Sequence, residues 1–287
     1  MGVNLREIRR RIDSVGTMQK TTRAMKTVSV AKLGRASAAI AAARPYAEKI
    51  HEVLAAVSRG ADPDAHPLLV PREPVKRLEV VVFASDRGLC GAFNANIIKR
   101  AEKLIVQRRP GLDAVTIVPI GRKAQMYFER HHYGEIPRAW SGIRAVVPEK
   151  AREIAEYLMA RYVDGEVDQT LLVYSVFQSA LTQHPSDVGL LPVPPGEAEE
   201  SAAGDYEIEP SAPALLQALV PRAVEFAVFR ALLENQAGEH GARMTAMENA
   251  TNNTVDLIRR LTLDYNKARQ AAITAELIEI VSAVEAS

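Results

Sequence analysis

Residues 85–91 (SDRGLCG) combine the residue types best suited to chemistry in this chain of 287 residues. They follow an apolar run and precede an amphipathic one, where an α/β enzyme places a phosphate-binding loop or a nucleophile. The segment matches neither G-x-G-x-x-G nor the P-loop, and a cysteine version of G-x-S-x-G would need glycine in place of Ala92. Its glycines also suit a tight turn ahead of a helix capped by Asn94. From the residues alone, an anion-binding loop and a structural turn both remain open.

Metal and thiol chemistry have little support in the sequence. The six histidines show no ligand spacing, and His131 and His132 are adjacent, so each histidine is expected to have a surface or core role. Cys90 is the sole cysteine, which excludes an internal disulfide and a cysteine-rich metal site. Four methionines at helical spacing are more typical of packing than of function: Met18, Met25, Met244 and Met247. We expect no catalytic residue, no metal and no cofactor.

The composition is that of a soluble globular protein. Apolar residues make up 47% and charged residues 25%, and the net charge of +1 gives no general reason to expect nucleic acid as a partner. The start lacks a secretory signal, and we expect no apolar stretch of transmembrane length, hence no direct membrane insertion. The Arg-rich opening could belong to a transit peptide, but Glu7 and Asp13 interrupt it and the helical pattern continues far beyond it.

Both ends of the chain have long helical patterns. Apolar residues at heptad spacing predict a helix over residues 5–57, with Pro45 as a candidate kink. Between its two apolar blocks the seam is polar: Gln19, Thr22, Lys26 and Ser29. The last 70 or so residues also read as helix, with a kink or restart at Pro221 and weak points at Gly238 and Gly241. The stripe of that helix is apolar: Leu257, Leu261, Tyr265, Ala268, Ala272, Ile273, Leu277, Ile280 and Val284.

The middle of the chain alternates strand and helix patterns. Strands are predicted at residues 78–84, 114–120, 170–177 and 189–193, and helices at 94–109, 122–132 and 148–162. This order is typical of an α/β sheet layered by helices. We therefore expect five parts: an N-terminal coiled-coil helix (1–59), a proline-rich extended linker (60–77), an α/β domain (78–193), a mobile acidic loop (194–210) and a C-terminal coiled-coil helix (211–287).

The two terminal helices are expected to pair. A long helix that is apolar along one stripe needs a partner, because propensity alone leaves it marginal. An antiparallel coiled coil of the two chain ends is the economical arrangement. Residues 1–44 of the first helix contain ten cations and only two acidic residues, Glu7 and Asp13. The cations could form a solvated face, or they could slide against the surface of an acidic partner.

Four segments resemble the signature segments of one family, the gamma subunit of F-type ATP synthase: residues 18–33 (MQKTTRAMKTVSVAKL), 85–96 (SDRGLCGAFNAN), 121–128 (GRKAQMYF) and 243–277 (RMTAMENATNNTVDLIRRLTLDYNKARQAAITAEL). The resemblance runs from end to end of the chain. Ala92 and Phe93 replace a commoner Gly-Leu pair, which is a conservative departure. Residues 194–209 contain no cysteine, so the redox-switch insertion of chloroplast relatives is absent.

The resemblance implies a Rossmann-like α/β domain with a coiled coil that forms a central stalk. This stalk would turn inside a ring of three alpha and three beta subunits, beside the epsilon subunit and on the membrane ring of c subunits. Proton flow would drive the rotation, and the rotation would cycle the beta sites through their conformations for ATP synthesis. The subunit would have no active site, and its complex would lie peripherally on the cytoplasmic side of a bacterial cell membrane.

The resemblance also implies roles for individual residues. Met25, with Arg23 and Lys26 beside it, corresponds to the methionine near the lever loop of a beta subunit. Contacts with the catch loops are implied for three C-terminal residues: Arg269, Gln270 and Thr274. Tyr206 is a weaker match to the region associated with epsilon and the c ring. On this interpretation the polar gap between Gln19 and Ser29 is where the helix leaves its partner and turns toward a catalytic subunit. The alternative is a soluble nucleotide-binding α/β enzyme with a helical dimerisation arm.

Overall fold

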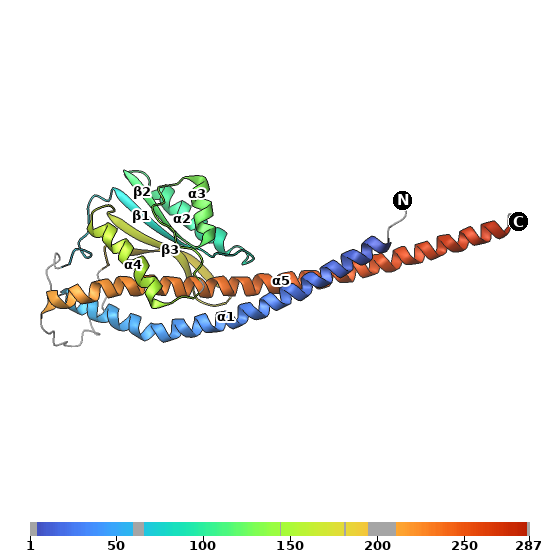
Figure 1. Ribbon diagram of the computed structural model, residues 1–287, viewed down its shortest axis with the longest axis horizontal. Coiled ribbons are helices and arrows are strands. Elements are labelled where there is room, and N and C mark those ends of the chain that lie inside the picture. The colour runs from blue at the N-terminus through green and yellow to red at the C-terminus, as the bar shows by residue number, and fades with distance from the viewer. Residues whose placement is uncertain (1–4, 60–65, 144, 181, 195–210, 286–287) are drawn as a thin grey trace. The chain divides into compact units, whose positions relative to one another are not determined.

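A computed structural model describes residues 5–59, 66–143, 145–180, 182–194 and 211–285. Two long helices bracket the chain: α1 (Leu5–Arg59) and α5 (Ala212–Glu285), with 55 and 74 residues. Contacts group the chain into two compact units, which we call the first unit (Met1–Ser29 with Arg243–Ser287) and the second unit (Val30–Ala242). Each long helix contributes to both units (Figure 1). The expected α/β fold with an antiparallel coiled coil is confirmed.

The second unit is built on a four-stranded sheet in the order β2-β1-β3-β4. β1 (Arg77–Phe83) pairs in parallel with β2 (Ala114–Ile120) and with β3 (Gln169–Phe177), and β4 (Gln183–Leu191) pairs antiparallel to β3. The first three strands are runs of apolar and β-branched residues, which suits strands that are buried on both faces.

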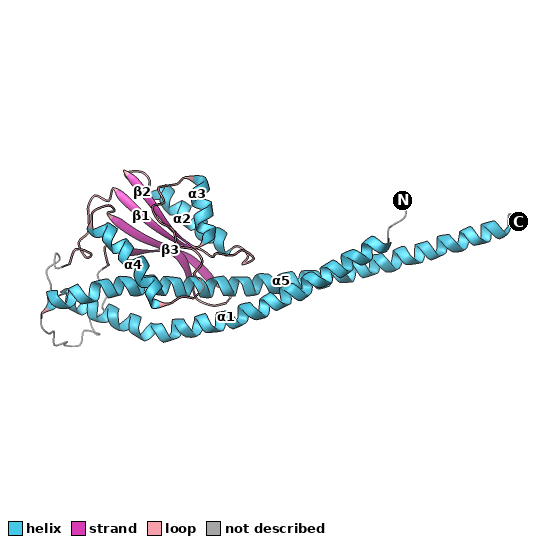
Figure 2. Ribbon diagram, in the orientation of Figure 1, coloured by secondary structure: helices cyan, strands magenta, loops and turns pink. Residues whose placement is uncertain are grey.

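Helices cover both faces of the sheet (Figure 2). α2 (Phe93–Arg108) and α3 (Arg122–His131) share one apolar core with residues such as Val80 and Ile117. α4 (Pro148–Val163) shares the other core with residues such as Val81 and Val118. The end of α1 and the start of α5 join this second core through a set of buried side chains: Ile50, Leu54, Val57, Leu216, Val220, Val224, Val228 and Leu232.

The first unit is an antiparallel pair of helices with a polar seam. The hydroxyl oxygens of Thr22 and Thr251 lie 2.8 Å apart, and Lys26 Nζ lies 2.7 Å from Glu248 Oε1. Thr22 and Ser29 are buried, whereas Met18 and Val28 are exposed, so the predicted seam register is confirmed. The prediction that α1 leaves its partner between Gln19 and Ser29 is wrong, because a hydrogen bond and an ion pair hold the helices together over that stretch.

Two further expectations need correction, and part of the predicted linker is packed: Leu68 is buried, its carbonyl accepts the Val193 N–H (2.8 Å), and the Val70 carbonyl accepts the Tyr162 hydroxyl (2.7 Å). Neither Pro45 nor Pro221 ends its helix, so α5 does not restart at Pro221. The fourth strand begins at Gln183, not at residue 189. The five-part division of the chain stays a prediction, and its acidic loop, apart from Pro194, lies outside the described residues.

α5 also bears on the expected lack of a transmembrane segment. By length and composition it is apolar enough to cross a membrane, with a window of mean hydropathy 1.3 that is 33% buried. The expectation from the sequence was therefore too strict. One such helix is weak support for a membrane span, because core helices of soluble proteins also reach this hydropathy, and part of α5 packs on the sheet.

Candidate functional site

The loop at residues 85–91 uses its polar side chains in hydrogen bonds within the protein. It follows β1, and the Asp86 carboxylate accepts the N–H groups of Arg122 and Gly142, both at 2.9 Å. Asn94 is not the predicted cap, since α2 begins after Ala92 without a side-chain cap bond. Its side chain instead reaches back into the loop, where Oδ1 accepts the Ser85 N–H (2.9 Å) and Nδ2 donates to Cys90 Sγ (3.2 Å).

The backbone of this loop is left-handed at Leu89 (φ 63°) and at Gly91 (φ 57°). Gly91 thus supplies part of the turn as expected, whereas Gly88 is not left-handed and the bulkier Leu89 takes that conformation in its place. The Leu89 side chain is 64% exposed. Loop hydrogen bonds and the buried Cys90 hold this conformation, which supports the structural-turn interpretation.

The crevice where an α/β protein binds nucleotides is occupied by α5. In a sheet with this strand order, ligands bind outside the carboxyl ends of β1 and β3, where the chain connections reverse direction. There the Phe177 N–H at the end of β3 donates to Glu234 of α5 (3.4 Å). A hollow of about 50 Å³ remains between Ala84, Ser85, Gly121 and Asn235. Sites for small molecules need roughly 300 Å³ or more, so this crevice has no room for a nucleotide.

Two glycines let α5 approach the sheet closely. A Cβ at Gly238 would lie 2.9 Å from Phe93 Cε2, and one at Gly241 would lie 2.9 Å from the Ala180 carbonyl oxygen. The sequence marked both glycines as weak points of the helix. The structure corrects this interpretation, because they are positions of close packing.

In two ion pairs of the second unit the pKa of the acidic residue is shifted from its usual value. Burial would raise the pKa of Asp168, but hydrogen bonds from the Arg77 side chain and from the N–H groups of Lys76 and Arg77 hold that pKa below its usual range. Glu79 is fully buried, and burial raises its pKa although Arg161 Nε lies 2.7 Å from Glu79 Oε1 and counteracts the rise. Both pairs join strands to neighbouring segments, so we assign them to stability.

The histidines have no catalytic arrangement among the described residues. Buried His66 accepts the Leu68 N–H at Nδ1 (3.1 Å), and burial lowers the pKa of His66. Within the described residues no group of three or more His, Cys, Asp or Glu side chains could hold a metal ion.

The residues that the resemblance singles out lie in the first unit at two separate levels. Arg23 is exposed, and Met25 and Lys26 are half-buried, with Lys26 engaged by Glu248. Arg269, Gln270 and Thr274 are exposed on α5, where the Thr274 hydroxyl donates to the Gln270 carbonyl (2.9 Å). Tyr206 lies outside the described residues.

The separation of the two levels follows from the helix pairing. Facing residues have numbers that add to about 273 or 274, as for 22 with 251 and 26 with 248. Met25 therefore lies level with about residue 249, and roughly 20 residues, or about 30 Å, separate that level from Arg269. The structure does not bring the two groups of predicted contact residues together.

The far end of α5 is a part of the site that sequence reasoning misassigned. By the same register, Leu5 lies level with about residue 269, so residues 270–285 extend about 24 Å past the described part of α1. Ile273, Leu277, Ile280 and Val284 were expected on the seam, yet they are 49–72% exposed. The two predicted helices differ in length, and this difference could have indicated that the end of the longer one has no partner helix.

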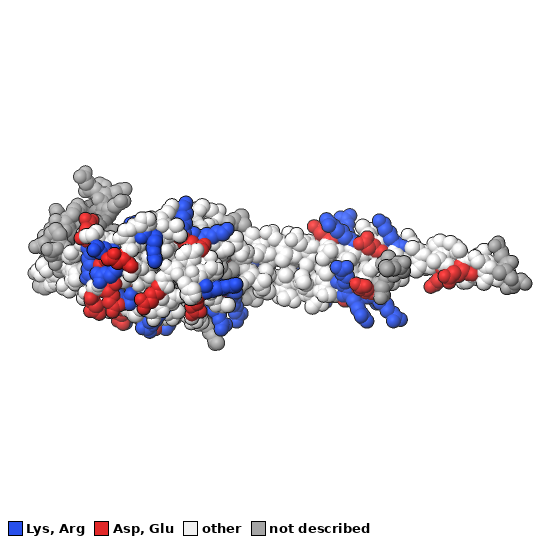
Figure 3. All heavy atoms as spheres, turned by 90° about the horizontal axis from the view of Figure 1, so that it is seen from above, with Lys and Arg blue, Asp and Glu red and all other residues white. Residues whose placement is uncertain are grey.

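Charges of the first unit are also unevenly placed. Lys and Arg side chains gather where the two helices run side by side (Figure 3). Arg9, Arg10 and Arg11 of α1 are exposed. The end of α5 has exposed acidic residues instead, Glu276 and Glu279. The first unit thus offers a basic paired stretch followed by a single helix that is apolar and acidic.

Comparison with known proteins identifies the family. The family model described as ATP synthase matches residues 4–286. The ATP synthase gamma chain of Anaeromyxobacter sp. (strain Fw109-5) is 47% identical over 288 residues, with 99% of each chain covered. That of Pelotomaculum thermopropionicum is 44% identical over 285 residues, again with 99% of each covered. A chain of the Euglena gracilis mitochondrial ATP synthase rotor has a similar fold, with TM-score 0.65, 20% identity, and coverage of 94% of this chain and 98% of that one. The chain therefore belongs to the ATP synthase gamma chain family.

Proposed function

We propose that this member of the family is the central-stalk rotor subunit of a bacterial ATP synthase and couples rotation of a membrane ring to the catalytic cycle of beta subunits. The observation that carries the proposal is the end of α5, where a single helix exposes apolar side chains over residues 270–285. Exposed apolar surface of this kind marks an interaction site. An enclosing sleeve of alpha and beta subunits would cover it on all sides.

The mechanism that we propose needs an asymmetric rod and no chemistry from the rod itself. One orientation would present Arg23 and Met25 to a given beta subunit, and another would present a different face of the coil. Each orientation then has different contact energies with each beta subunit, so rotation shifts three coupled conformational equilibria in sequence. Arg269, Gln270 and Thr274 would form the second level of contact, on the catch loops, about 30 Å along the rod.

The remaining partners and the location are part of the same proposal. The second unit would contact the epsilon subunit and stand on the ring of c subunits, with Tyr206 in that region. The complex would lie on the cytoplasmic side of the membrane, and the chain itself would not insert. Two observations support this placement: the similar bacterial chains are ATP synthase gamma chains, and the similar Euglena chain comes from a rotor.

Disulfide trapping tests the contact at Met25. Cys90 is the sole cysteine and is 1% exposed, so Met25→Cys would provide the one reactive thiol of the chain. In the assembled complex, oxidation against a cysteine placed in the beta lever loop should form a cross-link that stops ATP turnover, and a reductant should restore it. Met126→Cys, on the exposed face of α3 (56% exposed), is the matched control and should not cross-link.

Two results would count against the proposal. One is a failure of Met25→Cys to cross-link while the complex still assembles and turns over. The other is ATP binding or hydrolysis by the purified chain without alpha and beta subunits, which would favour the nucleotide-binding enzyme instead.

A further inference from the structure

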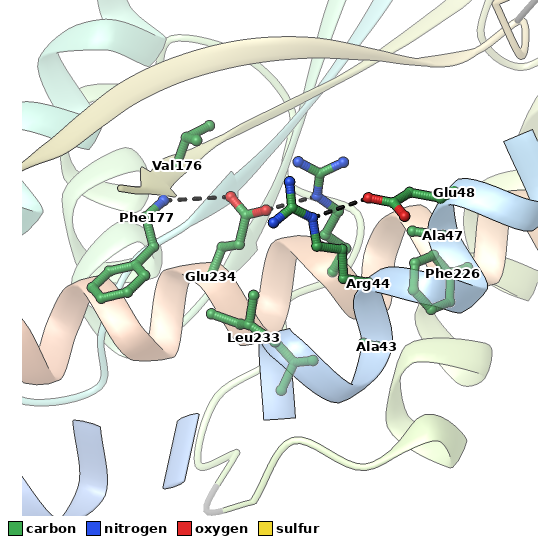
Figure 4. Close-up of a pocket in the computed structure, with 11 residues that line it drawn as sticks. Ala43, Arg44, Ala47, Glu48, Val176, Phe177, Phe226, Leu233 and Glu234 are labelled. Atoms are coloured by element: carbon green, nitrogen blue, oxygen red, sulfur yellow. Dashed lines mark hydrogen bonds and ion pairs between the residues drawn. The ribbon is translucent and has the colours of Figure 1, made fainter. Parts of the chain in front are cut away.

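A cavity of about 370 Å³ lies within the second unit, where α1, the end of β3 and α5 meet (Figure 4). We call it the Arg44 cavity. Val176 and Phe177 come from β3, Arg44 and Ala47 from α1, and Leu233 and Glu234 from α5. Its volume falls in the range of about 300–1,000 Å³ that is typical of small-molecule sites. Phe177 and Glu234 lie at its edge toward the occupied crevice of the sheet, and the polar seam of the first unit takes no part in it.

The wall of the Arg44 cavity is apolar and well supported. Ala43 and Ala47 stand one helical turn apart on α1, and their short side chains leave the space open. Opposite them, Leu233 is buried and Phe226 is half-buried, and the Phe226 ring packs against Tyr46 with 5.0 Å between centroids. Such a wall suits an aliphatic or aromatic body.

The rim of the cavity has two arginines with spare donors. Arg44 Nε donates to Glu48 Oε1 (3.0 Å), and Arg230 Nε donates to Glu234 Oε1 (2.6 Å). An arginine has five N–H donors, and the Nη groups of these two form no hydrogen bond with any described residue. The Arg44 and Arg230 side chains are 77% and 51% exposed, so a ligand can reach both.

The two glutamates differ in how firmly they are held. Glu234 has a 6% exposed side chain and also accepts the Phe177 N–H, so it stays in place. Glu48 is 67% exposed, and an exposed ion pair contributes little to stability, so another acceptor can replace Glu48 on Arg44. Donors therefore outnumber acceptors at the rim, and the missing group is an acceptor that accepts two hydrogen bonds from a guanidinium.

We propose that the Arg44 cavity binds a small amphipathic carboxylic acid, with its carboxylate on Arg44 and Arg230 and its apolar body against Phe226 and Leu233. A medium-chain fatty acid has this chemistry. The carboxylate displaces Glu48 from Arg44 and takes up the free Nη donors, while the chain fills space that water occupies poorly.

Calorimetry and saturation-transfer NMR on the full chain, with decanoate as the probe below its micelle concentration, test this site. Decanoate should bind saturably with one molecule per chain, and decylamine should bind at least about fivefold more weakly, because its head cannot accept hydrogen bonds. Arg44→Gln should weaken decanoate about five- to tenfold, as expected for loss of a charge-assisted pair. Ala47→Leu should abolish binding by filling the cavity.

Arg152→Gln is the matched control, because Arg152 is an exposed arginine on α4 that pairs with Glu225 outside the cavity. It should leave the decanoate affinity unchanged. Arg44 is largely exposed, so Arg44→Gln should fold normally, and a thermal melt by circular dichroism verifies this for each variant. The proposal is overturned if decanoate shows no saturable binding, if decylamine binds equally well, or if folded Arg44→Gln binds with unchanged affinity.

Discussion

The hydroxyl of Thr22 meets the hydroxyl of Thr251 across the two helices of the first unit, at 2.8 Å between the oxygens. Each oxygen also lies within hydrogen-bond distance of a carbonyl of its own helix, Thr22 with Gln19 (3.1 Å) and Thr251 with Met247 (2.7 Å). A seam position that heptad packing would fill with an apolar side chain is thus polar and fully satisfied.

Replacement of both threonines by valine should stabilise the first unit or leave it unchanged, because both partners are removed and the shape is kept. Either single change should cost at most about 1 kcal/mol, since the remaining hydroxyl keeps its own carbonyl. Urea unfolding of the four proteins, followed by circular dichroism, gives the coupling energy. A double variant that is less stable than both single variants would show that the two hydroxyls stabilise the first unit more than the packing of two valine side chains does.

Gly241→Ala should destabilise the second unit by about 1–2 kcal/mol, although alanine is the better helix former. The new Cβ would lie 2.9 Å from the Ala180 carbonyl, and backbone cannot move aside as a flexible side chain can. Gly34→Ala on α1 is the control, because nothing lies within 4 Å of its Cβ position, and it should add up to about 1 kcal/mol. Changes of the same sign in the two urea midpoints would contradict this account of Gly241.

Asp168→Asn should make the stability of the second unit less dependent on acid pH. The folded pKa of Asp168 lies below its unfolded value of 3.8, so its stabilisation is complete above that value and is lost as pH falls through the folded pKa. The variant should lose about 2–3 kcal/mol near neutral pH, typical of hydrogen bonds to a charged group, and progressively less toward low pH. Asp113→Asn, 70% exposed and 3.9 Å from Lys76, should change stability by under about 0.5 kcal/mol. A loss of equal size at neutral and acid pH would rule out ionisation as the cause.

Arg161→Leu should leave the buried Glu79 without its main partner and cost about 3–5 kcal/mol near neutral pH. The pKa of Glu79 is already raised above 4.5, so its contribution favours the fold at low pH and is lost as pH rises through the folded pKa. Without Arg161 that loss should grow, and the variant should recover part of its stability near pH 5. Glu166→Gln removes an exposed partner of Arg161 and serves as control. Urea titrations at both pH values measure the difference.

Deletion of residues 270–287 should reduce coupled turnover of the assembled complex severalfold while the second unit stays folded. All core residues of the second unit precede residue 243, and residues 270–284 are exposed except for the half-buried Ala272. Thermal unfolding of the purified variant should keep the main transition of the full chain. Loss of that transition would mean that the end of α5 supports the sheet.

Periodicity was sufficient for most elements of this fold. Runs of apolar residues located β1, β2 and β3 within one residue of their bounds. The start of β4 was missed because Gln183 to Asp187 has no apolar alternation: β4 is an edge strand, where Pro185 can be accommodated without a ladder N–H. The heptad register also placed Thr22 and Ser29 correctly on the seam.

What the sequence could not provide was contact between distant segments. The residues next to Gly238 in the sequence do not show whether it weakens the helix or allows a close approach to another segment. Its packing partner, Phe93, lies 145 residues earlier in the chain. The Arg44 cavity likewise depends on three elements that meet only after folding. The implied beta-subunit contacts of Met25 and Arg269 rest on the family resemblance and stay predictions.

The place of α5 in the second unit also sets an order of events during synthesis. All four strands have left the ribosome once residue 191 has emerged, but Leu216, Val224 and Leu232 complete the core beneath them only later. Until then the nascent sheet exposes an apolar face and an open crevice, the surface that chaperones bind and that promotes aggregation. A chain that terminates before α5 therefore cannot bury that face, and the cell's quality control can recognise it as incomplete.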